Sequence, residues 1–411
     1  MKFSKSSQLF LVSSIGLLVA TLLAACSVAT VDYVFVTSAP ASVNGQIYTF
    51  DADSESGALR SGPAAVSSGG IDPVALAVTS DYANLYVANK TTGNVVHFTI
   101  GSNGVLTAVN TDTVNITAPV ALAVNSAGTY LYVVSGTGTS TSPATLSEYA
   151  LSSGTISTPT TAKATQTLTL SGYASDVLIP TGVTVLANTS TVSGNGVYVT
   201  AYDQSAYNPG GSTTSTANPG WIFGFTVGTG GALSSTTNSP YKAGTQPSGI
   251  ASAPTDLYLY VTDYASNELI GYSILSSGQL NLLGGSDSTT ATGSEPSAVA
   301  IDPRGLFIYV SNAGDSTVSA YAITLATGAP TVEANSSSTT NTEPVAIAVD
   351  PALGRFVFTA NYLDNSISGF RLNSTSGALT TTQATPYPTG SKPTALIIAP
   401  HGNHATQSVS P

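Results

Sequence analysis

The sequence predicts an all-β fold, a seven-bladed β-propeller of four-stranded antiparallel blades, and three observations support it. One phrase recurs seven times along the chain, and each complete copy contains four short strand signals. Only 8% of the residues are charged, and glycine, serine and threonine separate the apolar runs. The two ends of the chain carry complementary halves of one repeat. Together these features are typical of a closed ring of blades.

Each copy of the repeat opens with a proline and a short apolar strand, which we expect to line the centre of the ring. Pro73–Val78 is such an inner strand, and Leu85–Asn89 follows it as a second strand that is typical of strands packed on both faces. Val95–Ile100 is the third strand, and a turn at Gly104 leads to the fourth. The strand-opening prolines are Pro73, Pro119, Pro180, Pro247, Pro296, Pro344 and Pro393. The last three spacings between them, 49, 48 and 49 residues, predict regular blades.

The chain ends predict how the ring closes. Tyr33–Val36 has the pattern of a second strand but lacks an inner strand before it. Pro393–Ile398 has the pattern of an inner strand but lacks a second strand after it. We expect the two segments to pair in one blade, because an open ring would leave unpaired strand edges.

The N-terminal 25 residues are predicted to be a signal peptide. Lys2 and Lys5 precede the apolar run Leu9–Leu23, which is shorter than the roughly 20 residues of a spanning helix. Leu23–Cys26 resembles the lipobox of bacterial lipoproteins, and this resemblance implies that Cys26 is lipidated. An ordinary secretory signal with a chance cysteine is the alternative.

These observations divide the chain into residues 1–25 (signal peptide), 26–30 (lipidated tether), 31–400 (propeller) and 401–411 (flexible C-terminal tail). We therefore expect an extracytoplasmic, membrane-anchored lipoprotein on the periplasmic or outer-membrane and cell-surface side. Cys26 is the only cysteine, so disulfides are excluded. The lipid anchor would be the membrane contact, and the protein is expected to be a monomer.

Charge and composition exclude several classes of function. After loss of the signal peptide, eight cationic and 21 acidic residues leave a net charge of −13, which disfavours nucleic acid as a partner. Three histidines and one cysteine do not support a Ser-His-Asp triad or a Cys/His metal cluster. We therefore predict no metal site and no cofactor. A calcium ion in the channel would need six to eight oxygen ligands, which the sequence does not guarantee.

The repeat, Pro-x-x-(Ile/Leu/Val)-Ala followed by Leu-Tyr-Val-x-Asn and Gly-x-Leu-Thr, resembles the lactonase family of seven-bladed propellers and its Tyr-Val-Thr-Asn-type repeats. This resemblance implies hydrolysis of sugar-acid lactones such as 6-phosphogluconolactone, with an Arg-His pair after a strand-opening proline. Here no strand-opening proline is followed by arginine or histidine. No catalytic residue of the family can therefore be assigned to this chain.

The residues just before the strand-opening prolines form the first candidate site, because they should surround one mouth of the channel. Five of them form a continuous polar arc: Gln246, Glu295, Glu343, Lys392 and Asp72. The arc could bind a cation or a polyhydroxylated ligand, and Glu295 and Glu343 are the candidate acids for catalysis. A solvated rim without a ligand is the alternative.

A long insertion in the third repeat is the second candidate. It contains Asp203, Tyr207 and Trp221, residue types that suit contact with a carbohydrate or a protein. The alternative is a flexible surface loop, with Trp221 packed at the start of a strand.

From these observations we expect a non-catalytic, lipid-anchored propeller of the cell envelope that binds a protein or a glycan. A diverged lactonase that hydrolyses a sugar-acid lactone is the alternative.

Overall fold

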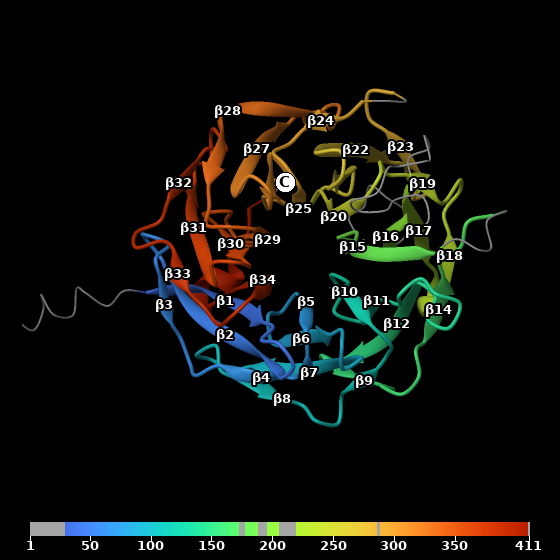
Figure 1. Cartoon of the computed structure of the whole chain (residues 1–411), viewed down its shortest axis with the longest axis horizontal. Helices are drawn as coiled ribbons and strands as arrows, with labels where there is room; N and C mark the ends of the chain where they lie inside the picture. The colour runs from blue at the N-terminus through green and yellow to red at the C-terminus, as the bar shows by residue number, and fades with distance from the viewer. Residues whose placement is uncertain (1–28, 172–176, 188–194, 205–218, 286–287, 410–411) are drawn as a thin grey trace, which may run out of the picture.

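The computed structural model describes residues 29–171, 177–187, 195–204, 219–285 and 288–409, and within them seven antiparallel sheets stand in a ring (Figure 1). The predicted seven-bladed propeller is therefore confirmed. The proposed signal peptide, Cys26 and Tyr207 lie outside the described residues.

The first three blades along the chain contain β5 to β19. Blade 1 consists of β5 (Pro73–Val78), β6 (Asn84–Asn89), β7 (Asn94–Ile100), β8 (Leu106–Ala108) and β9 (Val114–Asn115). Blade 2 consists of β10 (Pro119–Val124), β11 (Tyr130–Ser135), β12 (Thr145–Ser152), β13 (Thr155–Ile156) and β14 (Ala164–Thr167). Blade 3 consists of β15 (Leu178–Val185), β16 (Asn195–Asp203), β17 (Gly220–Val227), the 3-10 turn η1 (Thr229–Gly231), β18 (Leu233–Ser235) and β19 (Tyr241–Lys242).

The remaining blades complete the ring. Blade 4 consists of β20 (Pro247–Ser252), β21 (Tyr258–Asp263), β22 (Glu268–Ile274), β23 (Leu280–Leu282) and β24 (Thr290–Ala291). Blade 5 consists of β25 (Pro296–Ile301), β26 (Phe307–Asn312), β27 (Thr317–Ile323) and β28 (Pro330–Thr339). Blade 6 consists of β29 (Pro344–Val349), β30 (Phe356–Asn361), β31 (Ser366–Leu372), β32 (Leu379–Thr381) and β33 (Tyr387–Pro388). The closing blade consists of β34 (Pro393–Pro400), β1 (Thr30–Ser38), β2 (Asn44–Asp53), β3 (Leu59–Ser61) and β4 (Val66–Ile71).

The outer edge of most blades is divided. In six blades two short strands pair with the third strand, where the sequence predicted one fourth strand. Blade 5 alone keeps a continuous outer strand, β28, of ten residues. Short, interrupted edges offer little template for pairing with another chain.

The ring closes as the sequence predicts. β1 pairs with β34, and Tyr33 lies opposite Ala399 while Val36 lies opposite Leu396. Figure 1 shows the consequence, because the blue N-terminal strands and the red β34 share one blade. Pairing between the first and last strands of the fold therefore closes the ring.

Neighbouring blades are joined by a repeated tyrosine of the second strand. The hydroxyl of Tyr309 donates to the carbonyl oxygen of Gly377 in the next blade, at 2.8 Å. The same bond forms at three further tyrosines, Tyr86 to Gly154, Tyr198 to Gly278 and Tyr260 to Gly328, whereas the hydroxyl of Tyr132 in blade 2 makes no such bond. These hydroxyls are buried between sheets, so each bond satisfies two groups that water does not reach.

Residues 401–411 are expected to be a flexible tail, but the structure gives most of them a defined place. Gly402–Thr406 form the 3-10 helix η2, which packs against β1 and β34. His404 is only 4% exposed. This segment has a defined place because the His404 imidazole contacts two buried aspartates, Asp32 and Asp350, instead of solvent. Among the residues described here, no helix has the length and hydropathy to span a bilayer.

Candidate functional site

The strand-opening prolines lie at one end of the channel, which we call the Pro mouth. In six of the seven blades, the residue before the proline accepts a backbone hydrogen bond from the residue after the second strand of the same blade. Lys90 N donates to Asp72 O at 2.8 Å, and Tyr362 N donates to Glu343 O at 2.8 Å. The same contact recurs in the pairs Ala39–Lys392, Gly136–Ala118, Tyr264–Gln246 and Ala313–Glu295. Each of these six blades therefore contributes two residues to the Pro mouth.

Five residues before the prolines have a left-handed backbone although none is a glycine. Their φ angles lie between +46° and +62°: Asp72, Ala118, Glu295, Glu343 and Lys392. This conformation costs roughly 1–2 kcal/mol for a residue with a Cβ. The turn from the outer edge of one blade into the next inner strand requires it, so the blade scaffold determines where these side chains lie.

A pocket of about 340 Å³ lies in the Pro mouth and spans four blades. Its polar groups come from Lys90 of blade 1, Thr181 and Tyr202 of blade 3, and Gln246, Ser248 and Tyr264 of blade 4. Its apolar floor comes from the inner strands: Val74, Val120, Ile179, Pro180 and Pro247. The side-chain oxygen Oε1 of Gln246 is buried and accepts no hydrogen bond from the described residues. The pocket thus combines an apolar floor, a cation and an acceptor that is not satisfied.

A second pocket, of about 540 Å³, lies at the same mouth where the closing blade meets blades 1 and 6. Asp72, Lys392 and Tyr362 line it, together with the loop at Ala39–Ser42. The Nζ of Lys392 lies 5.6 Å from the centre of the Tyr362 ring, and the Thr91 hydroxyl donates to Asp72 Oδ2 at 3.3 Å. Acidic, basic and aromatic groups are therefore next to one another.

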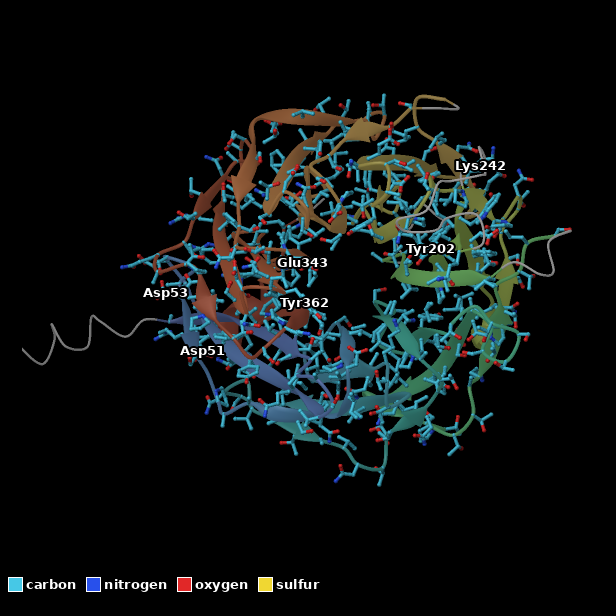
Figure 2. All side chains as sticks on the ribbon, viewed as in Figure 1. Asp51, Asp53, Tyr202, Lys242, Glu343 and Tyr362 are labelled. Carbon is cyan, nitrogen blue, oxygen red and sulfur yellow. The ribbon has the colours of Figure 1, made fainter. Side chains whose placement is uncertain are left out.

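The predicted polar arc is divided by the structure. Gln246 lines the first pocket, and Asp72 and Lys392 line the second. Glu295 is exposed and Glu343 is half-buried, and neither lines either pocket. Figure 2 shows Glu343 and Tyr362 at the rim of the ring's centre, with Tyr202 on the opposite side. The two candidate acids stand at the mouth but outside its hollows, and their catalytic role stays a prediction.

The second candidate site lies partly outside the described residues. Asp203 ends β16 and is buried, whereas Trp221 is half-buried near the start of β17 and packs against the core between blades 2 and 3. Neither lines the two pockets of the mouth. For Trp221 the structure favours the packing alternative.

Sequence reasoning missed Lys90, Tyr264 and Tyr362. All three follow the second strand of a blade, directly after the Asn or Asp that ends the repeated phrase. The register of the repeat could have identified them, because the residue after the second strand lies opposite the residue before the proline. The side chains at this position vary from blade to blade, so they form no repeated motif.

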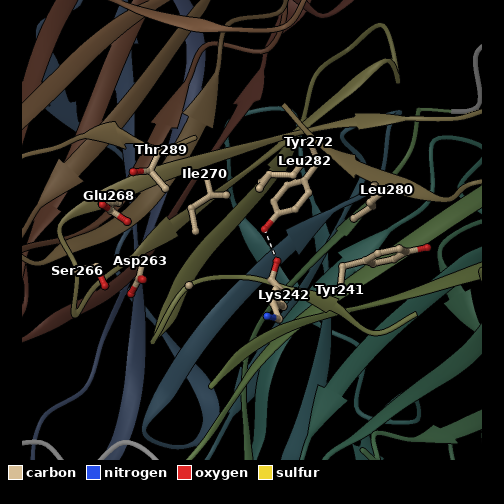
Figure 3. A pocket seen from close by; sticks show the side chains of 11 residues that line it. Tyr241, Lys242, Asp263, Ser266, Glu268, Ile270, Tyr272, Leu280, Leu282 and Thr289 are labelled. Carbon is tan, nitrogen blue, oxygen red and sulfur yellow. Dashed lines mark hydrogen bonds between the residues drawn. The ribbon is translucent and has the colours of Figure 1, made fainter. Parts of the chain in front are cut away.

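A third pocket, of about 520 Å³, lies away from the channel, between β19 and the outer part of blade 4 (Figure 3). Two acids line it, Glu268 and Asp263, and Asp263 accepts backbone hydrogen bonds from Thr245, Gln246 and Ala265. Tyr272 donates its hydroxyl to the carbonyl of Lys242 at 2.5 Å. Asp263 and Tyr272 therefore stabilise the blade through contacts with its backbone and with β19.

His97 also has a structural role, in the third strand of blade 1, where the sequence placed it. Its Nδ1 lies 3.0 Å from Asp112 Oδ2 and its Nε2 lies 2.9 Å from Asn84 Oδ1. Both ring nitrogens are satisfied in a buried site far along the blade from the inner strand.

Comparison with known families identifies one match. The family model described as "Lactonase, 7-bladed beta-propeller" matches residues 33–172 and 220–397. The unmatched stretch between them contains the insertion of the third repeat. No curated protein matches the chain in sequence.

Several solved structures share the fold. A candidate 6-phosphogluconolactonase from Bacteroides fragilis has a TM-score of 0.69 and 16% identity, covering 90% of this chain and 98% of its own. The periplasmic gluconolactonase of Pseudomonas aeruginosa has a TM-score of 0.69 and 18% identity, covering 90% and 99%. A candidate 6-phosphogluconolactonase from Bacteroides uniformis has a TM-score of 0.69 and 17% identity, with the same coverage.

Proposed function

Because the chain belongs to the lactonase family of seven-bladed β-propellers, we propose that its Pro mouth binds a sugar acid or the lactone of one. The observation that carries this proposal is the composition of the two pockets at this mouth. They combine three tyrosines (Tyr202, Tyr264 and Tyr362), an unsatisfied amide oxygen and the ammonium groups of Lys90 and Lys392.

The positions of the two lysines favour an anionic ligand over a neutral glycan. The chain has only four lysines after Lys5, and two of them line the mouth of a protein with a net charge of −11. A lysine ammonium binds a carboxylate as a point charge. The tyrosines offer an apolar ring face together with a polar hydroxyl, which suits a polyhydroxylated ligand.

Calorimetric titration with gluconate, glucono-lactone and glucose tests this proposal. We expect saturable binding of the acid or its lactone and weaker binding of glucose. Lys392→Ala and Lys90→Ala should each weaken binding by about 10-fold or more, which corresponds to roughly 1.4 kcal/mol. Lys242→Ala, in the outer strand β19 of blade 3, is the matched control. Binding that is absent for all sugars and acids tested, or unchanged in both mouth variants, contradicts the proposal.

Hydrolysis of a bound lactone is the second candidate function, favoured by the names of the structural neighbours. In this proposal Glu343 or Glu295 acts as a general base for water, a role that contributes typically 10²–10⁴-fold to a rate. The family's Arg-His pair is absent, so any turnover depends on other residues. Lactone hydrolysis, corrected for the spontaneous reaction, should fall at least about 100-fold in Glu343→Gln or Glu295→Gln. Turnover unchanged in both variants excludes these acids.

We also propose that the protein is an extracytoplasmic lipoprotein anchored through Cys26. The fold is compatible with this anchor, because β1 begins at the end of the channel opposite the Pro mouth. An anchored chain would then present the ligand pockets away from the bilayer. Metabolic labelling with a fatty acid should mark the wild-type protein and not Cys26→Ala. Equal labelling of both proteins, or labelling of neither, contradicts lipidation at this residue.

A further inference from the structure

Three side chains from distant parts of the chain meet at the end of the channel opposite the Pro mouth. Asp32 lies near the start of β1, Asp350 follows β29, and His404 lies in η2. All three are buried, and one ligand atom from each lies within 4.8 Å of the other two. The His404 Nε2 is 3.2 Å from Asp350 Oδ1 and 3.5 Å from Asp32 Oδ1.

The carboxylate of Asp32 is the unexplained group in this cluster. It is 0% exposed, and neither of its oxygens has a hydrogen-bond partner among the described residues. Asp350, in contrast, accepts backbone hydrogen bonds from Ala352 and Arg355. A buried carboxylate without a donor is costly, and its oxygens face the imidazole and the second acid.

The orientation of the histidine points to a cation between the three groups. His404 Nδ1 lies 2.7 Å from the Gln407 side-chain oxygen, which can only accept a hydrogen bond. The Nδ1 therefore carries a proton, and in the neutral ring the lone pair of Nε2 faces the two carboxylates. A metal-bound histidine is usually held in this way, by a hydrogen bond from its other nitrogen.

The charge balance of the cluster is compatible with a divalent ion. Two ionised carboxylates and an imidazolium carry a net charge of −1 in a buried site. The guanidinium of Arg355 lies 5.7 Å from the centre of the Phe356 ring, and its charge acts on Asp32 without a hydrogen bond. A divalent metal with neutral imidazole gives a net charge of zero. It also gives the orphaned Asp32 oxygens a partner.

We propose that Asp32, Asp350 and His404 bind one divalent transition-metal ion, with Zn²⁺ as the best match. One nitrogen and two carboxylate ligands suit Zn²⁺, at bond lengths of about 2.0–2.2 Å. A tetrahedral site with these bonds places its ligand atoms roughly 3.3 Å apart, close to the two distances measured to Nε2. Hard ions such as Ca²⁺ prefer six to eight oxygen ligands, which this cluster does not provide. The ion would link β1, the loop after β29 and the C-terminal η2.

The test uses the purified full-length mature protein, stripped with EDTA and dialysed. We expect one equivalent of Zn²⁺ to bind and to raise the thermal unfolding midpoint. Co²⁺ in the same site should show the visible absorption of a tetrahedral nitrogen and oxygen environment. Asp32→Asn, Asp350→Asn and His404→Gln should each weaken Zn²⁺ binding by at least about 100-fold, and Gln407→Ala by about 10–100-fold.

Two control variants test whether the other histidines contribute to Zn²⁺ binding. His401→Gln changes the neighbouring residue, which is not among the ligands, and His97→Gln changes a buried histidine beside a single aspartate. Both variants should still bind one equivalent. A wild-type protein that folds but binds no Zn²⁺, or binds it equally after all three ligand substitutions, overturns the proposal. Stabilisation by Ca²⁺ and not by Zn²⁺ also overturns it. These outcomes are independent of ligand binding at the Pro mouth.

Discussion

The tyrosine bonds between blades allow a quantitative test of how the ring is held together. Tyr309→Phe removes one hydroxyl from a side chain that is 0% exposed and retains the ring that packs between blades 5 and 6. The carbonyl of Gly377 then loses its 2.8 Å donor in a buried position. An unsatisfied buried acceptor costs about 1–3 kcal/mol. The residue at the same repeat position in blade 6 is already Phe358, so a phenyl ring is sterically compatible with this position.

The expected change in the unfolding temperature follows from the size of the protein. Unfolding entropies of about 2.1 cal/mol/K per residue give roughly 0.8 kcal/mol/K for a chain of about 380 residues. The midpoint should therefore fall by about 1–4 °C in Tyr309→Phe. Scanning calorimetry measures this change directly. Tyr48→Phe is the control, because its hydroxyl bonds to Gln46 at the surface and water can replace that partner. A midpoint for Tyr309→Phe that matches the control would refute the assignment of this bond as a link between blades.

Further predictions concern the closing blade and a buried acid. A chain ending at Lys392 lacks β34 and should show no cooperative unfolding by circular dichroism, whereas a chain ending at Pro400 keeps β34 and should unfold cooperatively at a lower temperature. Equal behaviour of the two truncations would argue against closure through β34. Burial raises the pKa of Glu148 from 4.5 to about 7, so folding favours its protonated form. The stability that depends on this proton is complete below about pH 4.5 and is lost as the pH rises through 7. The unfolding temperature of the wild type should thus fall relative to that of Glu148→Gln between pH 5 and pH 8, and parallel curves for the two proteins would exclude this titration.

The fold was predictable because the same pattern of apolar strands and polar turns recurs seven times along the chain. Runs such as Leu85–Asn89 are apolar on both faces, and only a strand between two packed sheets buries them. The divided outer edges were not predictable, since segments such as Val114–Asn115 are too short to carry a periodicity. The buried tail was missed for a different reason. His404 is held by contacts with residues more than 50 positions away, and local sequence does not report such contacts.

For the candidate site, the sequence predicted which backbone positions lie at the mouth but not which side chains line its pockets. The residues before the prolines do reach one mouth, because every blade presents this turn in the same way. Which of them line a hollow depends on the neighbouring blade, so Gln246 lines a pocket and Glu295 does not. Tyr207 cannot be placed among the described residues, and its role stays a prediction.

The pairing of β1 with β34 also has a consequence for biosynthesis. The hydrogen bond from Ala395 N to the Thr37 hydroxyl joins residues 358 positions apart. Ribosomes add about 5–20 residues per second, so the inner edge of β1 waits roughly 20–70 s for its partner to be made. During that interval the nascent chain carries an unpaired strand edge that could associate with another molecule. A factor that shields this edge until translation ends would raise the yield of the folded protein more than one that acts on any single later blade.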